Sequence, residues 1–250
     1  MFIDTNIVSK VKKGILSIST RRANISSVTA SELLLVYSGS RTAANYYVPV
    51  ISPFHLAASI GSSKRDHPFP KRFTDRIVFS FGKDFEPLME FGSNAIAKMV
   101  NEQNTDLLRQ SIAFMEKKQQ KVIREDFEFL MENEILCVPL TPAVVSNAYH
   151  LLSAYRAAGG QVKTVFRNSW NDILILSTAQ DSGDRFLTGD SQLSRFAASL
   201  LGEFTEQGSS ILEIRLNAVH DEIKKKNRES KGYINKGWRA SFVNGRLQAL

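Results

Sequence analysis

Four acidic side chains, Asp4, Glu32, Asp172 and Asp190, share one kind of local setting in this sequence. Three of them directly follow or end an apparent strand, in the stretches FIDT, SSVTASE and FLTGD, and the fourth follows the loop VFRNSWND. Each is expected near the start of a helix. Free backbone N–H groups and the positive end of the helix dipole favour acids there, so each acid taken alone is explained as a helix cap.

Two local patterns strengthen the capping interpretation. Thr29 and Glu32 match a capping box, in which a hydroxyl and an acid three residues later satisfy each other's backbone N–H groups. Ser169 and Asp172 match a variant of this pattern. The sequence therefore predicts helix starts at Thr29 and Ser169.

Taken together, the four acids indicate more than capping. The carboxyl ends of parallel strands lie along one edge of a sheet, so acids that are far apart in sequence can converge there. Converging carboxylates repel one another and need a counter-charge, and a hard divalent cation such as Mg²⁺ or Mn²⁺ supplies it through oxygen ligands. The four histidines are scattered and show no zinc-binding spacing, so we expect them on the surface or in packing: His55, His67, His150 and His220.

The elements that must position these acids alternate along the chain. Strands are predicted at residues 1–4, 23–28, 135–140 and 184–190. Helices are predicted after residue 5 and at 29–39, 106–134, 141–160, 169–183 and 191–201. The fourth of these, at 141–160, has Thr141 as its cap and Gly159 and Gly160 at its end. Alternating strands and helices predict an α/β fold, with a parallel sheet covered on both faces.

The segments FIDTNIV, ISSVTASELL and NDILILSTAQDSGDRFLTGDSQL resemble the three signature segments of PIN-domain ribonucleases, especially the VapC-type toxins. The preceding LCVPLTPAVVSNAYHLLSAYRAAGG resembles the family as well. This resemblance implies a PIN-like three-layer α/β/α fold with a central parallel sheet. It divides the chain into a nuclease domain at 1–200, with a largely helical insertion at 41–134, and a basic C-terminal extension at 201–250.

The resemblance also implies a chemistry. Asp4, Glu32, Asp172 and Asp190 would form a catalytic site that binds Mg²⁺ or Mn²⁺ and hydrolyses phosphodiesters. Products would carry 5′-phosphate and 3′-hydroxyl ends. Four neighbours would support the acids, with helix capping as the alternative role for the first three: Thr5, Asn6, Asn171 and Thr188. Arg167 is a candidate phosphate contact, with a plain surface arginine as the alternative.

Charge and composition agree with a polyanionic partner. The net charge is +7, and residues 221–250 hold eight Lys or Arg against three acids, including the run Lys224, Lys225 and Lys226. We expect this run to contact the substrate backbone, although a solvated tail has the same composition. The single cysteine, Cys137, lies in an apolar run and predicts a buried thiol in a reducing compartment. With no secretory signal or membrane span in the sequence, we expect a cytoplasmic protein.

The expected partners are RNA, with DNA left open, a small antitoxin protein and a second copy of the chain as a homodimer, but no membrane. Three alternatives remain. The first is a non-catalytic PIN-like module that binds nucleic acid or protein. The second is a phosphatase of the haloacid-dehalogenase type, which ranks lower because Asn6 stands where that chemistry needs a second Asp. The third is a plain α/β domain with four capped helices.

Overall fold

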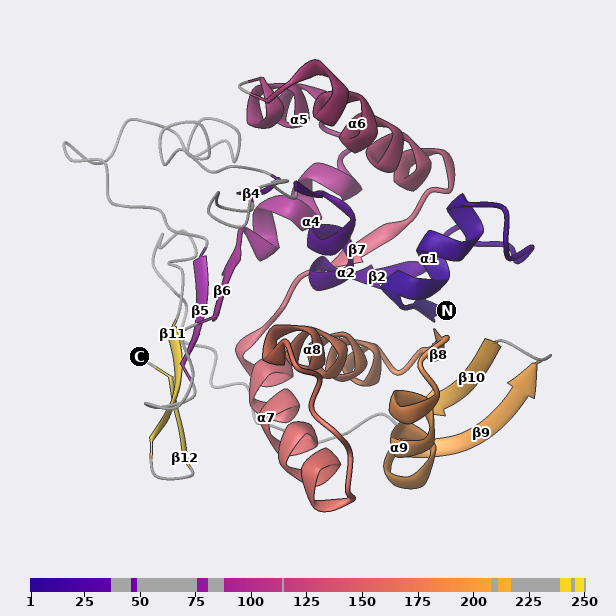
Figure 1. Cartoon of the computed structure of the whole chain (residues 1–250), viewed down its shortest axis with the longest axis vertical. Helices are drawn as coiled ribbons and strands as arrows, with labels where there is room; N and C mark the ends of the chain where they lie inside the picture. Colours follow the sequence, from indigo (N-terminus) through magenta and orange to yellow (C-terminus); the bar gives the residue numbers. More distant parts are fainter. Residues whose placement is uncertain are drawn as a thin grey trace, which may run out of the picture.

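The computed structural model describes residues 1–36, 46–48, 76–80, 88–113, 115–207, 211–216, 239–243 and 246–249 (Figure 1). The strands are β1 Phe2–Ile3, β2 Asn24–Ser26, β3 Leu35–Val36, β4 Tyr46–Tyr47, β5 Arg76–Ser80, β6 Leu88–Phe91, β7 Leu136–Val138, β8 Arg185–Thr188, β9 Gly202–Gln207, β10 Ile211–Leu216, β11 Arg239–Val243 and β12 Arg246–Ala249. The helices are α1 Thr5–Lys12, α2 Ser27–Leu33, α4 Ser93–Asn101, α5 Thr105–Ile112, α6 Lys117–Glu132, α7 Pro142–Ala157, α8 Phe166–Ser182 and α9 Ser191–Leu201. No helix in this part of the chain is long and apolar enough to cross a membrane.

The main sheet has the strand order β7-β2-β1-β8-β10-β9. Its first four strands run parallel, as the alternation of strands and helices predicts, and the fold is therefore α/β. The sheet continues through two antiparallel pairs, β8 with β10 and β10 with β9. The carboxyl ends of β1, β2 and β8 consequently meet at one edge, and Asp4 and Asp190 follow two of these strands directly.

The first strand has only two residues, and it is held in the sheet by a strand on each side. Phe2 pairs with Asn24 of β2 and with Phe186 of β8, and Ile3 pairs with Leu187. The backbone N–H of Asp4 then donates to the carbonyl of Leu187 at 3.0 Å. Central position in the sheet thus gives this two-residue strand hydrogen-bonding partners on both sides, and it fixes Asp4 at the sheet edge.

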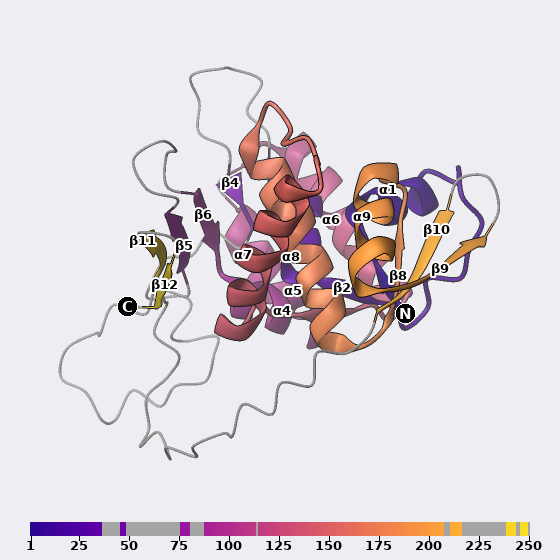
Figure 2. The same cartoon turned by 90° about the horizontal axis from the view of Figure 1, so that it is seen from below.

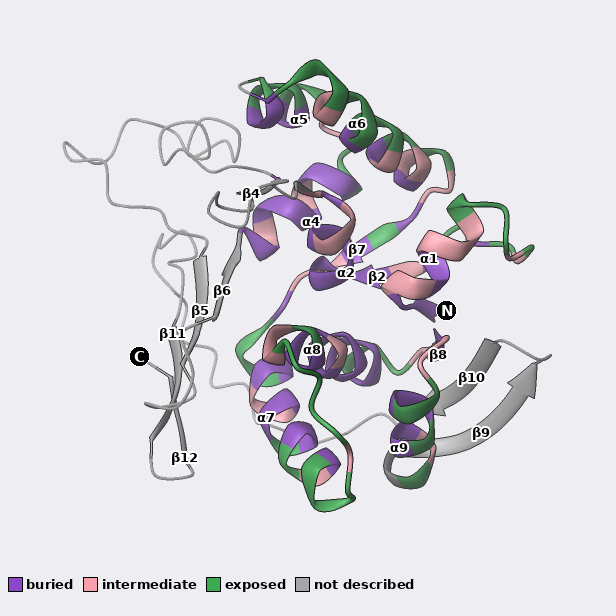
Figure 3. Ribbon diagram, in the orientation of Figure 1, coloured by how far each residue is buried: buried purple, intermediate pink, exposed green. Residues whose placement is uncertain are grey.

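Successive side chains of the strands point to opposite faces of the sheet and pack into two separate hydrophobic cores. Phe2 and Phe186 point to the face covered by α7, α8 and α9. Ile3, Leu187 and Cys137 point to the opposite face, which α1, α4, α5 and α6 cover. This is the three-layer arrangement predicted from the sequence, with the buried thiol where it was expected (Figures 1 and 3).

The predicted start of the second helix is wrong. Helix α2 begins at Ser27, and its cap is Ser26, whose Oγ accepts from the N–H of Val28 at 3.2 Å. Thr29 therefore lies inside the helix, and Glu32 lies in its last turn. Ser26, the last residue of β2, caps the helix three residues before Thr29, so the helix has already begun when the Thr29 pattern starts.

The predicted start at Ser169 is also wrong, although no side chain caps α8. Helix α8 begins at Phe166, with Val165 at the cap position, and Asp172 lies in its second turn. The Ser169 hydroxyl instead accepts from the backbone N–H of Lys163 at 2.8 Å. By contrast, the predicted Thr141 cap of α7 is confirmed, because its hydroxyl accepts from the N–H of Val144.

The predicted helix at 106–134 is divided into α5 and α6, and α4 precedes them. Elsewhere β11 pairs in parallel with β5, so strands from the segments 76–91 and 239–249 share a second sheet of order β12-β11-β5-β6. This sheet lies at the opposite end of the molecule from β9 and β10 in both views (Figures 1 and 2). The division into 1–200 and 201–250 stays a prediction, although the main sheet extends past residue 200 through β9 and β10.

Candidate active site

Asp4 is held at the end of β1 by three donors. Its Oδ1 accepts from the backbone N–H of Thr5 at 2.7 Å, which caps α1. Its Oδ2 accepts from Asn6 Nδ2 and from Thr188 Oγ1, each at 2.6 Å. Only 2 % of Asp4 is exposed. The carboxylate is therefore buried and fixed in orientation by side chains from two elements.

Glu32 reaches the same edge of the sheet from the last turn of α2. Its Oε2 accepts from Thr5 Oγ1 at 2.5 Å, and its Oε1 accepts from Asn171 Nδ2 at 2.7 Å. Thr5 follows Asp4 in sequence, and Asn171 precedes Asp172. These two hydrogen bonds connect Glu32 to the neighbourhoods of both acids, so its late place in the helix brings it into the cluster.

Asp190 follows β8 and caps α9. Its Oδ1 accepts from the backbone N–H groups of Gln192 and Leu193, both at 3.0 Å. Its own N–H donates to Thr188 Oγ1 at 3.0 Å. The Thr188 hydroxyl thus donates to Asp4 and accepts from Asp190, which fixes the first and last acids relative to one another.

The turn between Thr188 and Asp190 is closed by an amide side chain. Asn6 Oδ1 accepts from the backbone N–H of Gly189 at 2.8 Å, while its Nδ2 donates to Asp4. A Cβ at Gly189 would lie 3.0 Å from Lys10 Nζ and 3.1 Å from Asn6 Oδ1. A side chain at this position would therefore crowd the ends of two side chains of α1.

Asp172 points from α8 toward an unexpected cation. Lys163 Nζ lies 2.5 Å from Asp172 Oδ2 and 3.3 Å from Asp190 Oδ2. About a quarter of each carboxyl side chain is exposed, 23 % for Asp172 and 24 % for Asp190. The two later acids therefore reach solvent, whereas Asp4 lies beneath the surface.

Burial and mutual repulsion perturb the two aspartates that have the least solvent around them. Burial raises the pKa of Asp4 to about 7, and the negative charges of Asp172 and Glu32 add to the rise, while the Thr188 hydrogen bond opposes it. Burial also raises the pKa of Asp172 to about 6, and Asp190 adds to that rise, while Lys163 opposes it. The charges of Glu32, Asp172 and Asp190 thus act on these two aspartates, so the four acids lie in one electrostatic neighbourhood.

Eight of the predicted site residues lie near one another in the structure, and their catalytic and metal-binding roles stay predictions. The structure brings the four acids together, and each predicted supporting residue donates a hydrogen bond to one of them: Thr5, Asn6, Asn171 and Thr188. Arg167 lies half-buried in the first turn of α8, and its phosphate contact stays a prediction. The run from Lys224 to Lys226 lies outside the described residues.

Lys163 is the site residue that sequence reasoning missed. It lies in the segment between α7 and α8, in the stretch GGQVKTVF, which has no motif of its own. The weak signal available was its position nine residues before Asp172, on a loop that ends at the same sheet edge. Because the chain has 32 Lys and Arg residues, residue type alone does not distinguish Lys163 as a site residue.

The donor chemistry of the cluster suits a hard divalent cation. Four carboxylates offer oxygen ligands of the kind that Mg²⁺ and Mn²⁺ prefer. Burial, together with neighbouring negative charges, raises the pKa of Asp4 and Asp172, and a bound cation would oppose that rise. Within the described ranges, no group of three or more His, Cys, Asp or Glu side chains is arranged so that it could hold a metal ion. The positive charge next to Asp172 and Asp190 is instead the ammonium group of Lys163.

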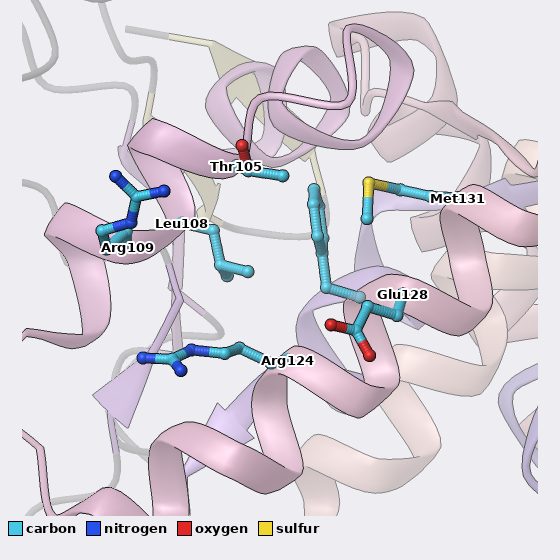
Figure 4. Close-up of a pocket in the computed structure, with 7 residues that line it drawn as sticks. Thr105, Leu108, Arg109, Arg124, Glu128 and Met131 are labelled. Carbon is cyan, nitrogen blue, oxygen red and sulfur yellow. The ribbon is translucent and has the colours of Figure 1, made fainter.

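A separate cavity of about 250 Å³ lies between α5 and α6 (Figure 4). None of the four acids lines it. Its lining combines apolar and charged side chains: Thr105, Leu108, Arg109, Arg124, Phe127, Glu128 and Met131. The cavity is therefore separate from the acid cluster.

Comparison with known families gives one match, to the PIN domain, over residues 98–199. The matched residues include Asp172 and Asp190 and also α5 and α6, which lie within the segment that sequence analysis assigned to an insertion. Comparison with curated proteins and with solved structures finds no match. The match covers less than half of the chain. Together with the four parallel strands and the helices on both faces of the sheet, it supports an α/β fold similar to that of PIN domains.

Proposed function

We propose that this protein is a metal-dependent endoribonuclease that hydrolyses RNA phosphodiester bonds at the acid cluster. PIN domains are generally nucleases, which supports a hydrolase. The observation that carries the proposal is the convergence of Asp4, Glu32, Asp172 and Asp190, which come from both ends of the chain. Separate helix caps, the simplest alternative, would not need to share one electrostatic site.

The residues of the chain would do most of the positioning. Asp4 and Glu32 each accept hydrogen bonds on both oxygens, so neither carboxylate can rotate freely. Asp172 and Asp190 are partly exposed and lie where a phosphate could approach. These four acids would hold Mg²⁺ or Mn²⁺, which supplies Lewis acidity and a nucleophilic water at neutral pH.

RNA is proposed as the substrate because of the resemblance to PIN-domain ribonucleases and because of the net charge of +7. The same resemblance supports a toxin role with a small antitoxin partner and a homodimeric state. Expression should then arrest growth, and co-expression of the small protein from a neighbouring reading frame should relieve the arrest. The mass of the purified protein in solution tests the dimer separately.

The decisive experiment measures cleavage of a labelled RNA in Mg²⁺ or Mn²⁺ by the wild type, Asp4→Asn and Asp172→Asn. Asp181→Asn is the matched control, because Asp181 is an exposed acid at the other end of the helix that carries Asp172. We expect both site variants to lose cleavage by about a hundredfold or more, the order found when one essential electrostatic group is removed. The control should keep wild-type activity, and the products should carry 5′-phosphate and 3′-hydroxyl ends.

Two outcomes would reject this function. Cleavage that persists in both site variants would show that the acids do not carry the reaction. Salt-sensitive RNA binding without any cleavage, in either metal, would favour the non-catalytic binding module instead. A DNA substrate run beside the RNA decides which nucleic acid is cut.

A further inference from the structure

The ammonium group of Lys163 bridges two of the site acids. Its Nζ lies 2.5 Å from Oδ2 of Asp172 and 3.3 Å from Oδ2 of Asp190. These acids belong to α8 and to the turn before α9, so one side chain from a third segment joins them. One ammonium group is thus within hydrogen-bonding distance of an oxygen of each acid.

The segment that carries Lys163 is anchored by specific contacts. The backbone N–H of Lys163 donates to the buried Ser169 Oγ at 2.8 Å. Three residues earlier, Gly160 passes over the Tyr155 ring so closely that a Cβ would lie 2.5 Å from a ring carbon. The backbone at the lysine and just before it is thus positioned by α7 and α8, and the side chain extends from this anchored segment.

The Lys163 side chain can move away from the two carboxylates into solvent. It is 45 % exposed, about twice as much as either carboxylate it contacts. Lysine ends in a compact charge on a flexible four-carbon stem, which allows it to swing into solvent without moving the backbone.

We propose that Lys163 is a tethered counter-ion of the site, which holds Asp172 and Asp190 together before a divalent cation binds and which the cation must displace. The proposal rests on the proposed function, because it treats these two acids as metal ligands. Both cations need the same carboxylate oxygens, and an ammonium beside a divalent ion is repelled. Lys163 therefore keeps the acids positioned at the expense of weaker metal binding.

The test measures Mn²⁺ binding by titration calorimetry at low ionic strength, without RNA. Lys163→Met should bind Mn²⁺ about tenfold more tightly than the wild type, which corresponds to about 1.4 kcal/mol. Lys163→Arg keeps the positive charge and should keep the weaker, wild-type affinity. Lys121→Met is the matched control, an exposed lysine that pairs with Glu125 one turn away on α6, and it should leave the affinity unchanged.

A double variant locates the effect. In Lys163→Met with Asp172→Asn, the gain in Mn²⁺ affinity should be smaller than in Lys163→Met alone, because the two residues act through one contact. Thermal unfolding in EDTA gives a second readout. Lys163→Met should unfold at a lower temperature than the wild type, and Mn²⁺ should raise its midpoint by more than it raises that of the wild type.

The outcomes separate the two proposals. If the wild type binds Mn²⁺ and cleaves RNA while Lys163→Met shows unchanged or weaker Mn²⁺ affinity, the counter-ion proposal is overturned and the nuclease proposal stands. If neither the wild type nor Lys163→Met binds Mn²⁺, both are overturned. Tighter binding in Lys163→Met with no RNA cleavage by any variant would support the counter-ion and reject the nuclease.

Discussion

Thr188 donates a hydrogen bond of 2.6 Å to Asp4, although 184 residues separate them in the chain. The two residues end neighbouring parallel strands, so the pairing of β1 with β8 brings them together. The same hydroxyl accepts from the N–H of Asp190. A single buried threonine consequently ties the first acid of the site to the last.

Removing this hydroxyl should weaken both the fold and the site. We expect Thr188→Val to lower the free energy of unfolding by about 1–3 kcal/mol, because it leaves a buried acceptor and a backbone donor with fewer partners. Thr188→Ser keeps the hydroxyl and should retain most of the stability and the RNA cleavage. Urea unfolding of both variants in EDTA measures the difference, and equal stability of the two would contradict the role given to the hydrogen bond.

The metal-free protein should become less stable as the pH rises. Asp4 has a pKa of about 7 in the folded state and Asp172 one of about 6, both above the ordinary value. Between roughly pH 4 and each folded value, the folded state binds more protons than the unfolded chain, so stability is lost as the pH rises through that range. Melting temperatures in EDTA from about pH 5 to about pH 8 should fall, because proton binding favours the folded state at the acid end.

Two variants test the source of this slope. Asp4→Asn removes the titrating group with the larger shift and should flatten the decline, whereas the exposed Asp181→Asn should leave it unchanged. A melting temperature that instead rises with pH in EDTA would mean that Asp4 does not have a raised pKa. Saturating Mn²⁺ should reduce the slope in the wild type, since a cation favours the ionised carboxylates.

Gly189→Ala should affect activity more than stability. The added methyl would meet Lys10 Nζ and Asn6 Oδ1, the ends of two side chains that can move. We expect a loss of stability of about 1 kcal/mol. Cleavage should fall by about tenfold to a hundredfold, because a displaced Asn6 shifts its hydrogen bond to Asp4 and small misplacements of reacting groups are costly.

A second substitution shows which neighbour matters. Lys10→Ala combined with Gly189→Ala removes the contact with the lysine and leaves that with Asn6. The double variant should therefore recover little of the lost activity. Full recovery would assign the close approach to Lys10 alone and would remove Asn6 from the explanation.

The fold and the acid cluster were predictable because they follow from order and spacing. Strands alternating with helices require a parallel sheet, and in a parallel sheet Asp4 and Asp190 must end on the same edge. The sequence also carries the supporting residues next to the acids, such as Thr5 beside Asp4 and Asn171 beside Asp172. Their adjacency indicated that both residues lie at the site, but each donates to Glu32, which is far from it in sequence.

Lys163 and the exact helix starts were not predictable for a physical reason. Lys163 reaches the site through the path of a loop, which depends on the packing of Gly160 against Tyr155 and not on any local preference. Helix starts depend on which hydroxyl captures the free N–H groups, and Ser26 did so before Thr29. Similarly, Glu32 reaches the site from the end of its helix, a position that a capping pattern would not suggest.

The difference between the predicted and observed starts of α2 can itself be measured. Thr29 is fully buried, and among the described residues its Oγ1 has no hydrogen-bond partner. Thr29→Val removes this unsatisfied hydroxyl, so the free energy of unfolding should stay within about 0.5 kcal/mol of the wild type or increase. If Thr29 were the cap that the sequence pattern indicates, the same change would cost about 1 kcal/mol.

Ser26→Ala provides the opposite case. The Ser26 hydroxyl accepts from the N–H of Val28, so its loss should lower the free energy of unfolding by about 1 kcal/mol. Since α2 carries Glu32 in its last turn, fraying of the first turn leaves the acid anchored by its own hydrogen bonds to Thr5 and Asn171. RNA cleavage by Ser26→Ala should therefore stay near that of the wild type at temperatures well below its midpoint. A loss of cleavage without unfolding would show that the helix start also positions Glu32.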